Sequence, residues 1–236
     1  MAGNQDLAGK VVLVTGASRG IGYAAAIEAA KRGAHVVAVA RTVGGLEELD
    51  DEIQDLGSAA TLVPLDLRDG DAIDRLGALD GLVANAGQLG VLSPLPHVKP
   101  EDFEKVMAVN VTANYRLLRA TDLLLRQSTA GRVGFVSSSS ARSARPFWGL
   151  YAASKAAVDA MAKSYAGEVA QTKVKVNVFY PGAVRTAMRA KAMPGENPDT
   201  LPKPSDIAPR LIDLISPAVK ESGKLFNIET GAFEDI

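Results

Sequence analysis

Residues Thr15-Gly-Ala-Ser-Arg-Gly-Ile-Gly22 join an apolar, β-branched run, Lys10 to Thr15, to a segment with helical spacing of apolar residues, Gly20 to Arg32. An apolar run closed by glycine is typical of a strand buried on both faces of a parallel sheet. Gly33 then ends the helix, and His35-Val-Val-Ala-Val-Ala40 predicts a second strand. The start of the chain therefore predicts one βαβ unit.

The same alternation of strands and helices continues along the chain. We expect further strands at 61–65, 81–84, 132–136, 175–179 and 224–228, helices at 46–56, 101–126, 150–170 and 205–215, and a short helical turn near Asp71 to Leu76. About seven strands separated mainly by helices predict an α/β fold, a Rossmann-type doubly wound parallel sheet flanked by helices. A length of 236 residues with no internal repeat fits a single domain, 1–236.

Composition excludes several classes of function. Without cysteine the chain forms no disulfide or thiolate site, and two distant histidines, His35 and His97, give little support for a metal site. A net charge of −1 with scattered basic residues argues against a nucleic-acid partner. No stretch approaches the roughly 18 apolar residues of a membrane span, and the first ten residues lack a signal-peptide pattern. We therefore expect no membrane association and a cytoplasmic location.

The glycine loop has the position of a phosphate-binding loop, because ligands of doubly wound sheets lie beyond the carboxyl ends of the strands. Gly16 permits a tight turn, Gly20 lets the backbone approach a pyrophosphate, and Gly22 allows close packing of helix on strand. The alternative is that these glycines merely end a strand. The strand-to-helix context favours a dinucleotide site.

The residues after the second strand bear on which dinucleotide binds. A free ribose 2′-hydroxyl usually meets an Asp or Glu there, whereas this chain has Arg41-Thr42. The Arg41 guanidinium, joined by Arg19 of the loop, suits a 2′-phosphate. We expect NADP(H) to be preferred, with NAD(H) possible. The alternative is that Arg41 is a solvated residue at a strand end.

Further motifs occur in order at predicted strand or helix ends: Asp66-Leu67, Asn85-Ala-Gly87, Val109-Asn110-Val111, the serines 137–140, Tyr151-Ala-Ala-Ser-Lys155, and Pro181-Gly182 followed by Thr186. With the glycine loop, they resemble the short-chain dehydrogenase/reductase family from Gly9 to about Gly231. The chain departs from the family pattern in a short segment from Arg68 to Leu79 and in Glu229-Thr-Gly-Ala232, which replaces a Gly-Gly ending.

The resemblance implies a proton relay of Asn110, Ser138, Tyr151 and Lys155. Together with the loop, it predicts contacts to the cofactor from Gly16, Ser18, Arg19, Gly20, Ile21, Gly22, Arg41, Thr42, Asp66, Leu67, Asn85, Ala86, Gly87, Tyr151, Lys155, Pro181, Gly182, Val184 and Thr186. In the family, the position of Asn110 holds a water of the relay. The alternative for Asn110 is an ordinary polar helix residue.

The proposed chemistry fits the residue types. Tyr151 and Lys155 lie one helical turn apart, and an ammonium beside a phenol is expected to lower its pKa toward the working pH of a general acid. Lys155 would also hold the nicotinamide ribose. The resemblance implies that Ser138 hydrogen-bonds the substrate oxygen, because its spacing of thirteen residues before Tyr151 matches the family arrangement. Ser137 and Ser139 are expected to alternate to the other sheet face, and Ser139 or Ser140 remains a candidate second donor.

The substrate side is expected at 88–95, 144–150 and 187–194, with residues 187–204 as a lid because Ala190 to Pro204 holds four prolines. The apolar residues there line a cavity or pack in a subunit interface: Phe147, Trp148, Leu150, Met188 and Met193. The arginines there recognise an acidic substrate or are simply solvated: Arg142, Arg145, Arg185 and Arg189.

These observations predict an NADP(H)-dependent oxidoreductase that transfers a hydride between nicotinamide and a small-molecule carbonyl or alcohol. One alternative is an NAD-linked alcohol dehydrogenase. Another is a non-catalytic dinucleotide-sensing or scaffold protein, because a fold alone does not establish activity. A homodimer or homotetramer is expected, and the sequence leaves the choice open.

Overall fold

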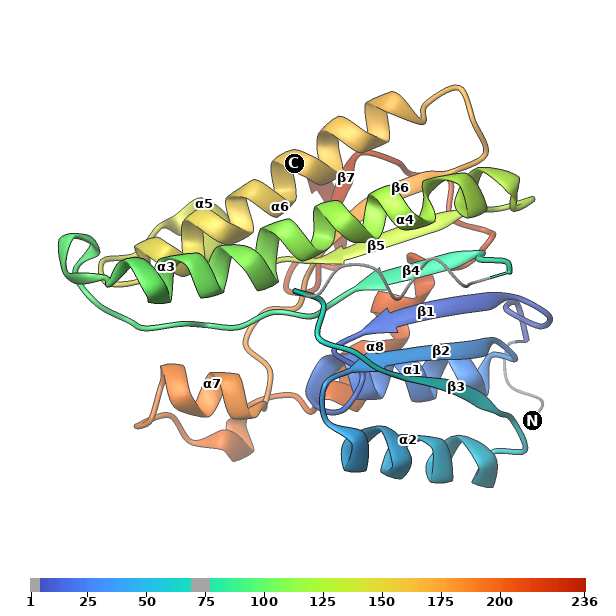
Figure 1. The fold of residues 1–236 in the computed structure, drawn as a ribbon, viewed down its shortest axis with the longest axis horizontal. Coiled ribbons are helices and arrows are strands. Elements are labelled where there is room, and N and C mark those ends of the chain that lie inside the picture. Colours follow the sequence, from blue (N-terminus) through green and yellow to red (C-terminus); the bar gives the residue numbers. More distant parts are fainter. Residues whose placement is uncertain (1–4, 69–76) are drawn as a thin grey trace.

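The glycine loop leaves the sheet at a central strand, β1 (Val11–Thr15). The computed structural model, which describes residues 5–68 and 77–236, pairs β1 in parallel with β2 (His35–Ala40) on one side and β4 (Gly81–Ala84) on the other. Four of the five β1 residues are buried, as expected of a strand covered on both faces. Figure 1 shows the resulting sheet between two layers of helices.

The sheet has eight strands in the order β3-β2-β1-β4-β5-β6-β7-β8. The predicted doubly wound parallel sheet is confirmed, with one strand more than predicted. The additional strand, β8, pairs antiparallel with β7 after a turn closed by a 2.9 Å hydrogen bond from the Gly231 N–H to the Asn227 carbonyl. The remaining strands are β3 (Ala60–Pro64), β5 (Arg132–Val136), β6 (Lys175–Tyr180), β7 (Lys224–Asn227) and β8 (Ala232–Asp235).

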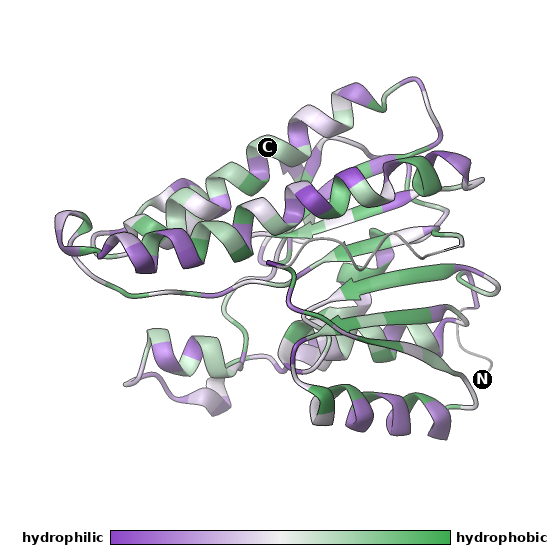
Figure 2. Cartoon of the chain, viewed as in Figure 1, coloured by the Kyte–Doolittle hydropathy of each residue, from purple (hydrophilic) through white to green (hydrophobic). Residues whose placement is uncertain are grey.

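Helices cover the two faces of the sheet in two groups (Figures 1 and 2). On one face, small residues of α1 (Gly20–Lys31), the helix after the glycine loop, pack against α8 (Pro204–Asp213) near the C-terminus. On the opposite face, α4 (Ala113–Gln127) and α6 (Gly149–Glu168) pack against the sheet. In Figure 2 the strands are mostly apolar and the helices carry polar residues between the apolar ones. The first group also contains α2 (Val43–Asp55).

The helix predicted over 101–126 is not one regular helix. It begins as α3 (Pro100–Met107), passes through a π-helical turn, η2 (Ala108–Thr112), and continues as α4. A π turn inserts an extra residue into the helical repeat, and such turns are frequent at functional sites. Asn110 lies in this turn and is fully buried. The predicted helical stretch therefore contains a π turn at the residue proposed for the relay.

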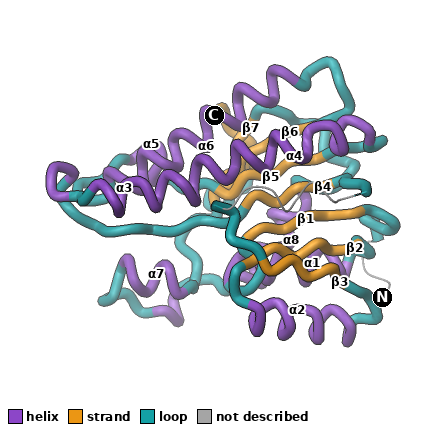
Figure 3. Tube along the Cα trace, in the orientation of Figure 1, coloured by secondary structure: helices purple, strands orange, loops and turns teal. Residues whose placement is uncertain are grey.

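Short helical elements fill the connections that follow the strands (Figure 3). The segment predicted to be irregular, 190–204, holds the end of one short helix and a 3-10 turn. The helical turn predicted near Asp71 to Leu76 lies outside the described residues. These elements are η1 (Leu95–His97), α5 (Ser140–Ser143), α7 (Ala187–Ala192) and η3 (Pro198–Thr200).

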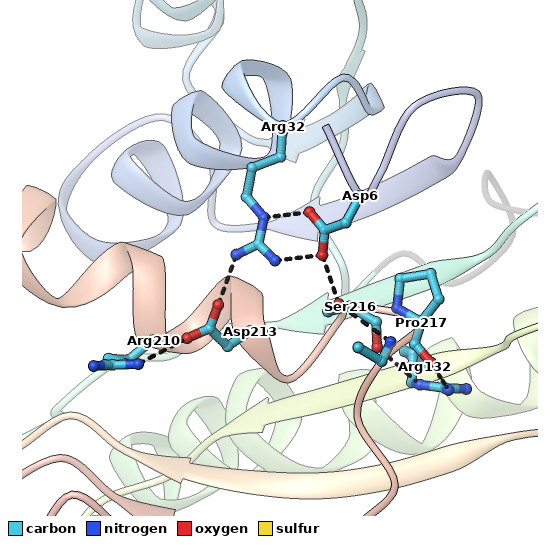
Figure 4. Close-up of polar contacts among 8 residues, drawn as sticks. Asp6, Arg32, Arg132, Arg210, Asp213, Ser216 and Pro217 are labelled. Atoms are coloured by element: carbon cyan, nitrogen blue, oxygen red, sulfur yellow. Dashed lines mark hydrogen bonds and ion pairs between the residues drawn. The ribbon is translucent and has the colours of Figure 1, made fainter. Parts of the chain in front are cut away.

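A polar cluster ties the start of the chain to the C-terminal helix (Figure 4). The Arg32 guanidinium pairs with Asp6 at 2.6 Å and with Asp213 at 2.8 Å. Asp6 also accepts a 2.5 Å hydrogen bond from the hydroxyl of Ser216. Beside it, the buried Arg132 side chain donates to main-chain carbonyls, among them Ser216 at 3.1 Å and Pro217 at 2.7 Å. These contacts hold α1, α8 and β5 in a fixed arrangement.

Within the described ranges, we find no helix with the length and apolarity needed to cross a membrane.

Candidate active site

The glycine loop is pinned to the end of β4 by Thr15 and Asn85. The Thr15 hydroxyl accepts the N–H groups of Asn85 and Ala86, each at 3.0 Å, and the Asn85 amide donates to the Thr15 carbonyl at 2.9 Å. A Cβ on Gly16 would lie 3.0 Å from Asn85 Nδ2, and one on Gly22 would overlap the Gly16 carbonyl oxygen. Side chains at either position would therefore force apart the elements that form the loop.

A cleft of about 680 Å³ opens beside the loop, at the carboxyl ends of the strands. That volume lies within the ordinary range of roughly 300–1,000 Å³ for ligand sites. Most of the predicted cofactor residues line it: Gly16, Ser18, Arg19, Gly20, Ile21, Arg41, Thr42, Asp66, Leu67, Asn85, Ala86, Gly87 and Thr186. Six predicted residues do not line it: Gly22, Tyr151, Lys155, Pro181, Gly182 and Val184.

Sequence reasoning missed one wall of this cleft. The missed residues lie on α3 and in the first half of the π turn. Their spacing of three, four and seven residues is that of a single helix face, which was a detectable signal. The residues of this wall are Asp102, Lys105, Val106 and Val109. Met188 and Lys191 also line the cleft and come from the segment predicted to be a lid.

At one end of the cleft, Asp66 lies between two arginines. The Arg68 guanidinium donates to Asp66 at 2.7 Å, and an Arg41 nitrogen lies 3.8 Å from the same carboxylate. The Arg68 hydrogen bonds hold the pKa of Asp66 down to about 2 against the opposing effect of burial. The Arg41 side chain is 61 % exposed and lines the cleft, so its positive charge is accessible to a ligand there.

Tyr151 lies in the first turn of α6 and is buried. Its hydroxyl shares a hydrogen bond with Ser138, the second residue beyond β5, and the Ser138 oxygen also accepts the Ser140 N–H at 3.2 Å. Burial raises the pKa of Tyr151 to about 12, while the Ser138 hydrogen bond acts to lower it. Tyr151 is therefore a phenol at neutral pH. The expectation that Lys155 would lower this pKa is not met.

The reason is the direction of the Lys155 ammonium. Its Nζ donates a 2.8 Å hydrogen bond to the carbonyl of Val136 and lies 5.9 Å from the centre of the Tyr151 ring. A Cβ on Gly87 would lie 3.5 Å from this Nζ, so the ammonium lies next to a residue that lines the cleft without lining it itself. Burial lowers the pKa of Lys155 to about 8, and the charge of Asp159 acts to raise it.

Asn110 joins the π turn to the loop after β4 and to α6. Its Oδ1 accepts the Gln88 N–H at 2.8 Å, and its Nδ2 donates to the Gln88 carbonyl at 3.0 Å and to the Ser154 hydroxyl at 2.9 Å. The Asn110 carbonyl in turn accepts the Asn114 amide at 2.6 Å. The structure thus brings Asn110 next to the segment that carries Tyr151 and Lys155, with its side chain fully engaged.

The segment after β6 approaches the glycine loop through Thr186. The methyl group of Thr186 would lie 3.6 Å from a Cβ on Gly20, and its hydroxyl caps α7 by accepting the Arg189 N–H at 3.1 Å. Val184 is buried, and Gly182 has a left-handed φ of 66° with Glu229 packed close to it. Pro181, Gly182 and Val184 therefore support this segment from behind the cleft.

Apolar side chains surround the approach to Tyr151. Trp148 packs edge-on against the Tyr151 ring with 6.2 Å between ring centres. Phe147 is 59 % exposed and has a left-handed φ of 71°, and its carbonyl accepts the Ser93 N–H at 3.0 Å. Leu150, by contrast, is 1 % exposed, so its predicted place in a cavity wall was wrong: it packs in the core behind Gly90.

Three of the four arginines considered for an acidic substrate are already paired. Arg185 pairs with Asp199 at 3.0 Å, Arg189 with Glu196 at 2.6 Å, and Arg142 with Glu234 at 3.5 Å. The first two pairs lie within residues 185–199 and stabilise that segment. Among the described residues, no group of three or more His, Asp or Glu side chains is arranged to hold a metal ion.

Comparisons with known proteins identify the family. The family model described as short chain dehydrogenase matches residues 10–197. The uncharacterized oxidoreductase YciK of Escherichia coli strain K12 is 38 % identical over 240 residues, covering 96 % of this chain and 95 % of that protein.

Two solved structures have nearly the same fold. A short chain dehydrogenase from Pseudomonas syringae has a TM-score of 0.91 at 40 % identity, covering 96 % of this chain and 97 % of that one. One from Escherichia coli CFT073, complexed with NADPH, has a TM-score of 0.89 at 37 % identity, covering 94 % and 98 %. The chain is an oxidoreductase that belongs to the short chain dehydrogenase family.

Proposed function

We propose that this oxidoreductase uses NADP(H) to interconvert a carbonyl compound and its alcohol. The observation that carries the proposal is the grouping of Ser138, the Tyr151 hydroxyl and Lys155, whose ammonium lies next to Gly87 in the cleft wall. A hydrogen-bond donor, a candidate general acid and a cation thus lie together close to one wall of the cleft.

The cleft residues fit a dinucleotide with a 2′-phosphate. Cβ atoms on Gly16 and Gly22 would meet neighbouring protein atoms, so these glycines keep the loop tight, and Gly16 and Gly20 place its main chain in the cleft wall where a pyrophosphate would bind. Arg41 and Arg19 supply cationic charge, and Asp66, the one carboxylate paired with Arg41 among residues 5–68 and 77–236, is engaged by Arg68. The NADPH bound to the related Escherichia coli CFT073 structure supports the same preference.

Bound NADPH supplies the hydride in this family of reactions. For the protein's part, Tyr151 gives its hydroxyl proton to the substrate oxygen as that oxygen gains negative charge. Ser138 hydrogen-bonds the same oxygen, and the Lys155 ammonium holds the nicotinamide ribose. Asn110 fixes the Gln88 main chain beside them. Its proposed role in holding a relay water stays a prediction.

Tyr151 is protonated in the resting protein, because burial raises its pKa to about 12. The protonated phenol is the form that donates to a carbonyl oxygen in the reduction. Oxidation of an alcohol requires the phenolate, and its rate is therefore expected to rise with pH. The exposed apolar side chains Phe147, Leu95 and Met188 favour a substrate with an apolar body.

Residues 187–204 are proposed as a lid over this substrate, because Met188 and Lys191 of α7 line the cleft. The internal pairs of Arg185 with Asp199 and of Arg189 with Glu196 allow the segment to move as a unit. A cytoplasmic location and assembly into a dimer or tetramer also stay predictions.

The test is the loss of NADPH absorbance with a panel of ketones, aldehydes and quinones, for wild type, Tyr151→Phe and Tyr115→Phe. Tyr115 is 54 % exposed on α4 and serves as the matched control. We expect turnover by wild type and the control, and a loss of about 100-fold or more in Tyr151→Phe. Equal rates in Tyr151→Phe and wild type would remove Tyr151 from the mechanism. Faster turnover with NADH would favour the NAD-linked alternative, and binding without any turnover would favour a dinucleotide-sensing protein.

A further inference from the structure

A buried carboxylate lies one helical turn beyond Lys155. Asp159 of α6 is 7 % exposed, and its Oδ2 accepts a 2.5 Å hydrogen bond from the hydroxyl of Tyr180 on β6. Its Oδ1 has no hydrogen-bond partner, alone among the buried side-chain nitrogen and oxygen atoms of the described residues. A buried oxygen left without a partner costs free energy, and such an atom calls for an explanation beyond packing.

Lys155 is a buried cation that lacks an ion-pair partner among the described residues. It is 4 % exposed, and its ammonium hydrogen-bonds the neutral Val136 carbonyl. Across residues 5–68 and 77–236, no carboxylate forms an ion pair with Lys155 within 4 Å, yet Asp159 lies on the same face of α6. Two charges one turn apart in an interior of low dielectric interact strongly without touching.

We propose that Asp159 is a positioning residue for Lys155: a buried counter-charge that keeps the Lys155 ammonium protonated while it serves the site. The inference rests on the role given to Lys155 in the proposed function. It adds to the relay a residue that the family motif does not contain.

The other groups around Asp159 favour its negative charge. Tyr180 on β6 hydrogen-bonds the carboxylate, and Arg142 of α5 adds a cation over the Tyr180 ring at 5.8 Å. Burial raises the pKa of Asp159, while the polar side chains of Ser137 and Tyr180 and the charges of Lys155 and Arg142 act in the opposite direction. In return, Asp159 is the group that acts to raise the pKa of Lys155.

Asparagine separates this role from a purely structural one. The amide oxygen of Asp159→Asn can accept the Tyr180 hydroxyl hydrogen as the carboxylate does, but it carries no charge. Asp159→Glu keeps the charge and is the matched control. If Asp159→Asn does not fold, Asp159→Ser removes the charge and retains a small hydrogen-bonding group.

The direct measurement is a pH titration of the Lys155 side chain by NMR in protein labelled with ¹³C-lysine. The resonance is assigned by its absence in Lys155→Met, and each variant is checked by circular dichroism. We expect a midpoint near pH 8 in wild type and in Asp159→Glu, from the lowered pKa of Lys155. In Asp159→Asn the midpoint should fall by about one pH unit. An unchanged midpoint in folded Asp159→Asn would overturn the proposal.

The second readout is the pH profile of kcat/KM for the best carbonyl substrate. Loss of the counter-charge should move the alkaline decline of Asp159→Asn to lower pH, whereas a structural defect would lower activity equally at every pH. A uniform loss contradicts the proposal. If wild type turns over no carbonyl, the proposed function fails, and the NMR titration still decides whether Asp159 sets the charge of Lys155.

Discussion

The Asn110 side chain binds both polar main-chain groups of Gln88, at 2.8 Å and 3.0 Å. Leucine at this position has a similar volume but would leave these groups without a partner, and the Ser154 hydroxyl would keep only its bond to the Tyr151 carbonyl. We expect Asn110→Leu to lower the free energy of unfolding by about 3 kcal/mol, which urea denaturation measures. Gln127→Leu, at the exposed end of α4, should change it by less than about 0.5 kcal/mol. If both variants change the free energy of unfolding equally, the contact between Asn110 and Gln88 does not stabilise the fold.

Ser138 and Ser139 provide a matched pair for the proposed chemistry. Ser138 hydrogen-bonds the Tyr151 hydroxyl, whereas the Ser139 side chain is exposed at the start of α5. We expect Ser138→Ala to lower kcat about 100-fold, because the substrate oxygen loses a donor that acts in the transition state. Ser139→Ala should keep wild-type kinetics. If Ser139→Ala is the slower variant in steady-state assays, Ser139 and not Ser138 donates the hydrogen bond to the substrate oxygen.

Gly22 and Gly44 both lie in helices but differ in the space around them. A Cβ on Gly22 would overlap the Gly16 carbonyl, whereas one on Gly44 would have no heavy atom within 4 Å. We expect Gly22→Ala to weaken NADPH binding at least tenfold, measured by fluorescence titration, because the loop must move. Gly44→Ala should bind normally and gain about 0.5 kcal/mol of stability. Normal binding by Gly22→Ala would show that the loop tolerates the displacement.

Arg41 is expected to distinguish the two cofactors. Removal of a cation that contacts a phosphate costs about 1.5–3 kcal/mol, so Arg41→Gln should weaken NADPH binding by about 10- to 100-fold. Binding of NADH, which lacks the phosphate, should be unchanged. Arg119→Gln on α4 is the control for nonspecific loss of charge. An equal loss for both cofactors would assign Arg41 a role in forming the cleft.

Asp66 makes the free energy of unfolding depend on pH in the acidic range. Its pKa is lowered from 3.8 to about 2, so the carboxylate stabilises the folded state above pH 4 and loses this effect as the pH falls toward 2. After allowance for solvent around the pair, we expect Asp66→Asn to be less stable by about 1 kcal/mol at pH 7. Urea denaturation at pH 7 and pH 2 measures the difference in stability between wild type and Asp66→Asn, which should disappear at pH 2. A difference that persists at pH 2 would exclude the charge as its source.

Much of the fold could be predicted because the apolar patterns are local. The β1 run and the glycines after it define a strand, a turn and a helix by their own residue types. The strand β8 was missed because Ala232-Phe-Glu-Asp235 is short and half acidic, and only its pairing with β7 makes it a strand. The π turn was missed because Asn110 takes its conformation from Gln88 and Ser154, which are distant in sequence.

The candidate site could be predicted residue by residue but not in its electrostatics. The four-residue spacing of Tyr151 and Lys155 predicts proximity, yet it does not reveal that the ammonium hydrogen-bonds Val136. Asp159 escaped attention because an acidic residue within a helix usually faces solvent. Its burial follows from the packing of α6 on β6, where Tyr180 meets it.

The packing of α1 on α8 has a consequence for the order of synthesis. The small buried residues of α1, Ala25, Ala26 and Ala29, belong to the same core as Ile207, Leu211 and Ile212 of α8, and Arg32 pairs with Asp213 beside them. A ribosome makes α1 early and α8 near the end of these 236 residues. The dinucleotide-binding half therefore cannot complete its core until α8 has been made, and the apolar face of α1 stays uncovered until then.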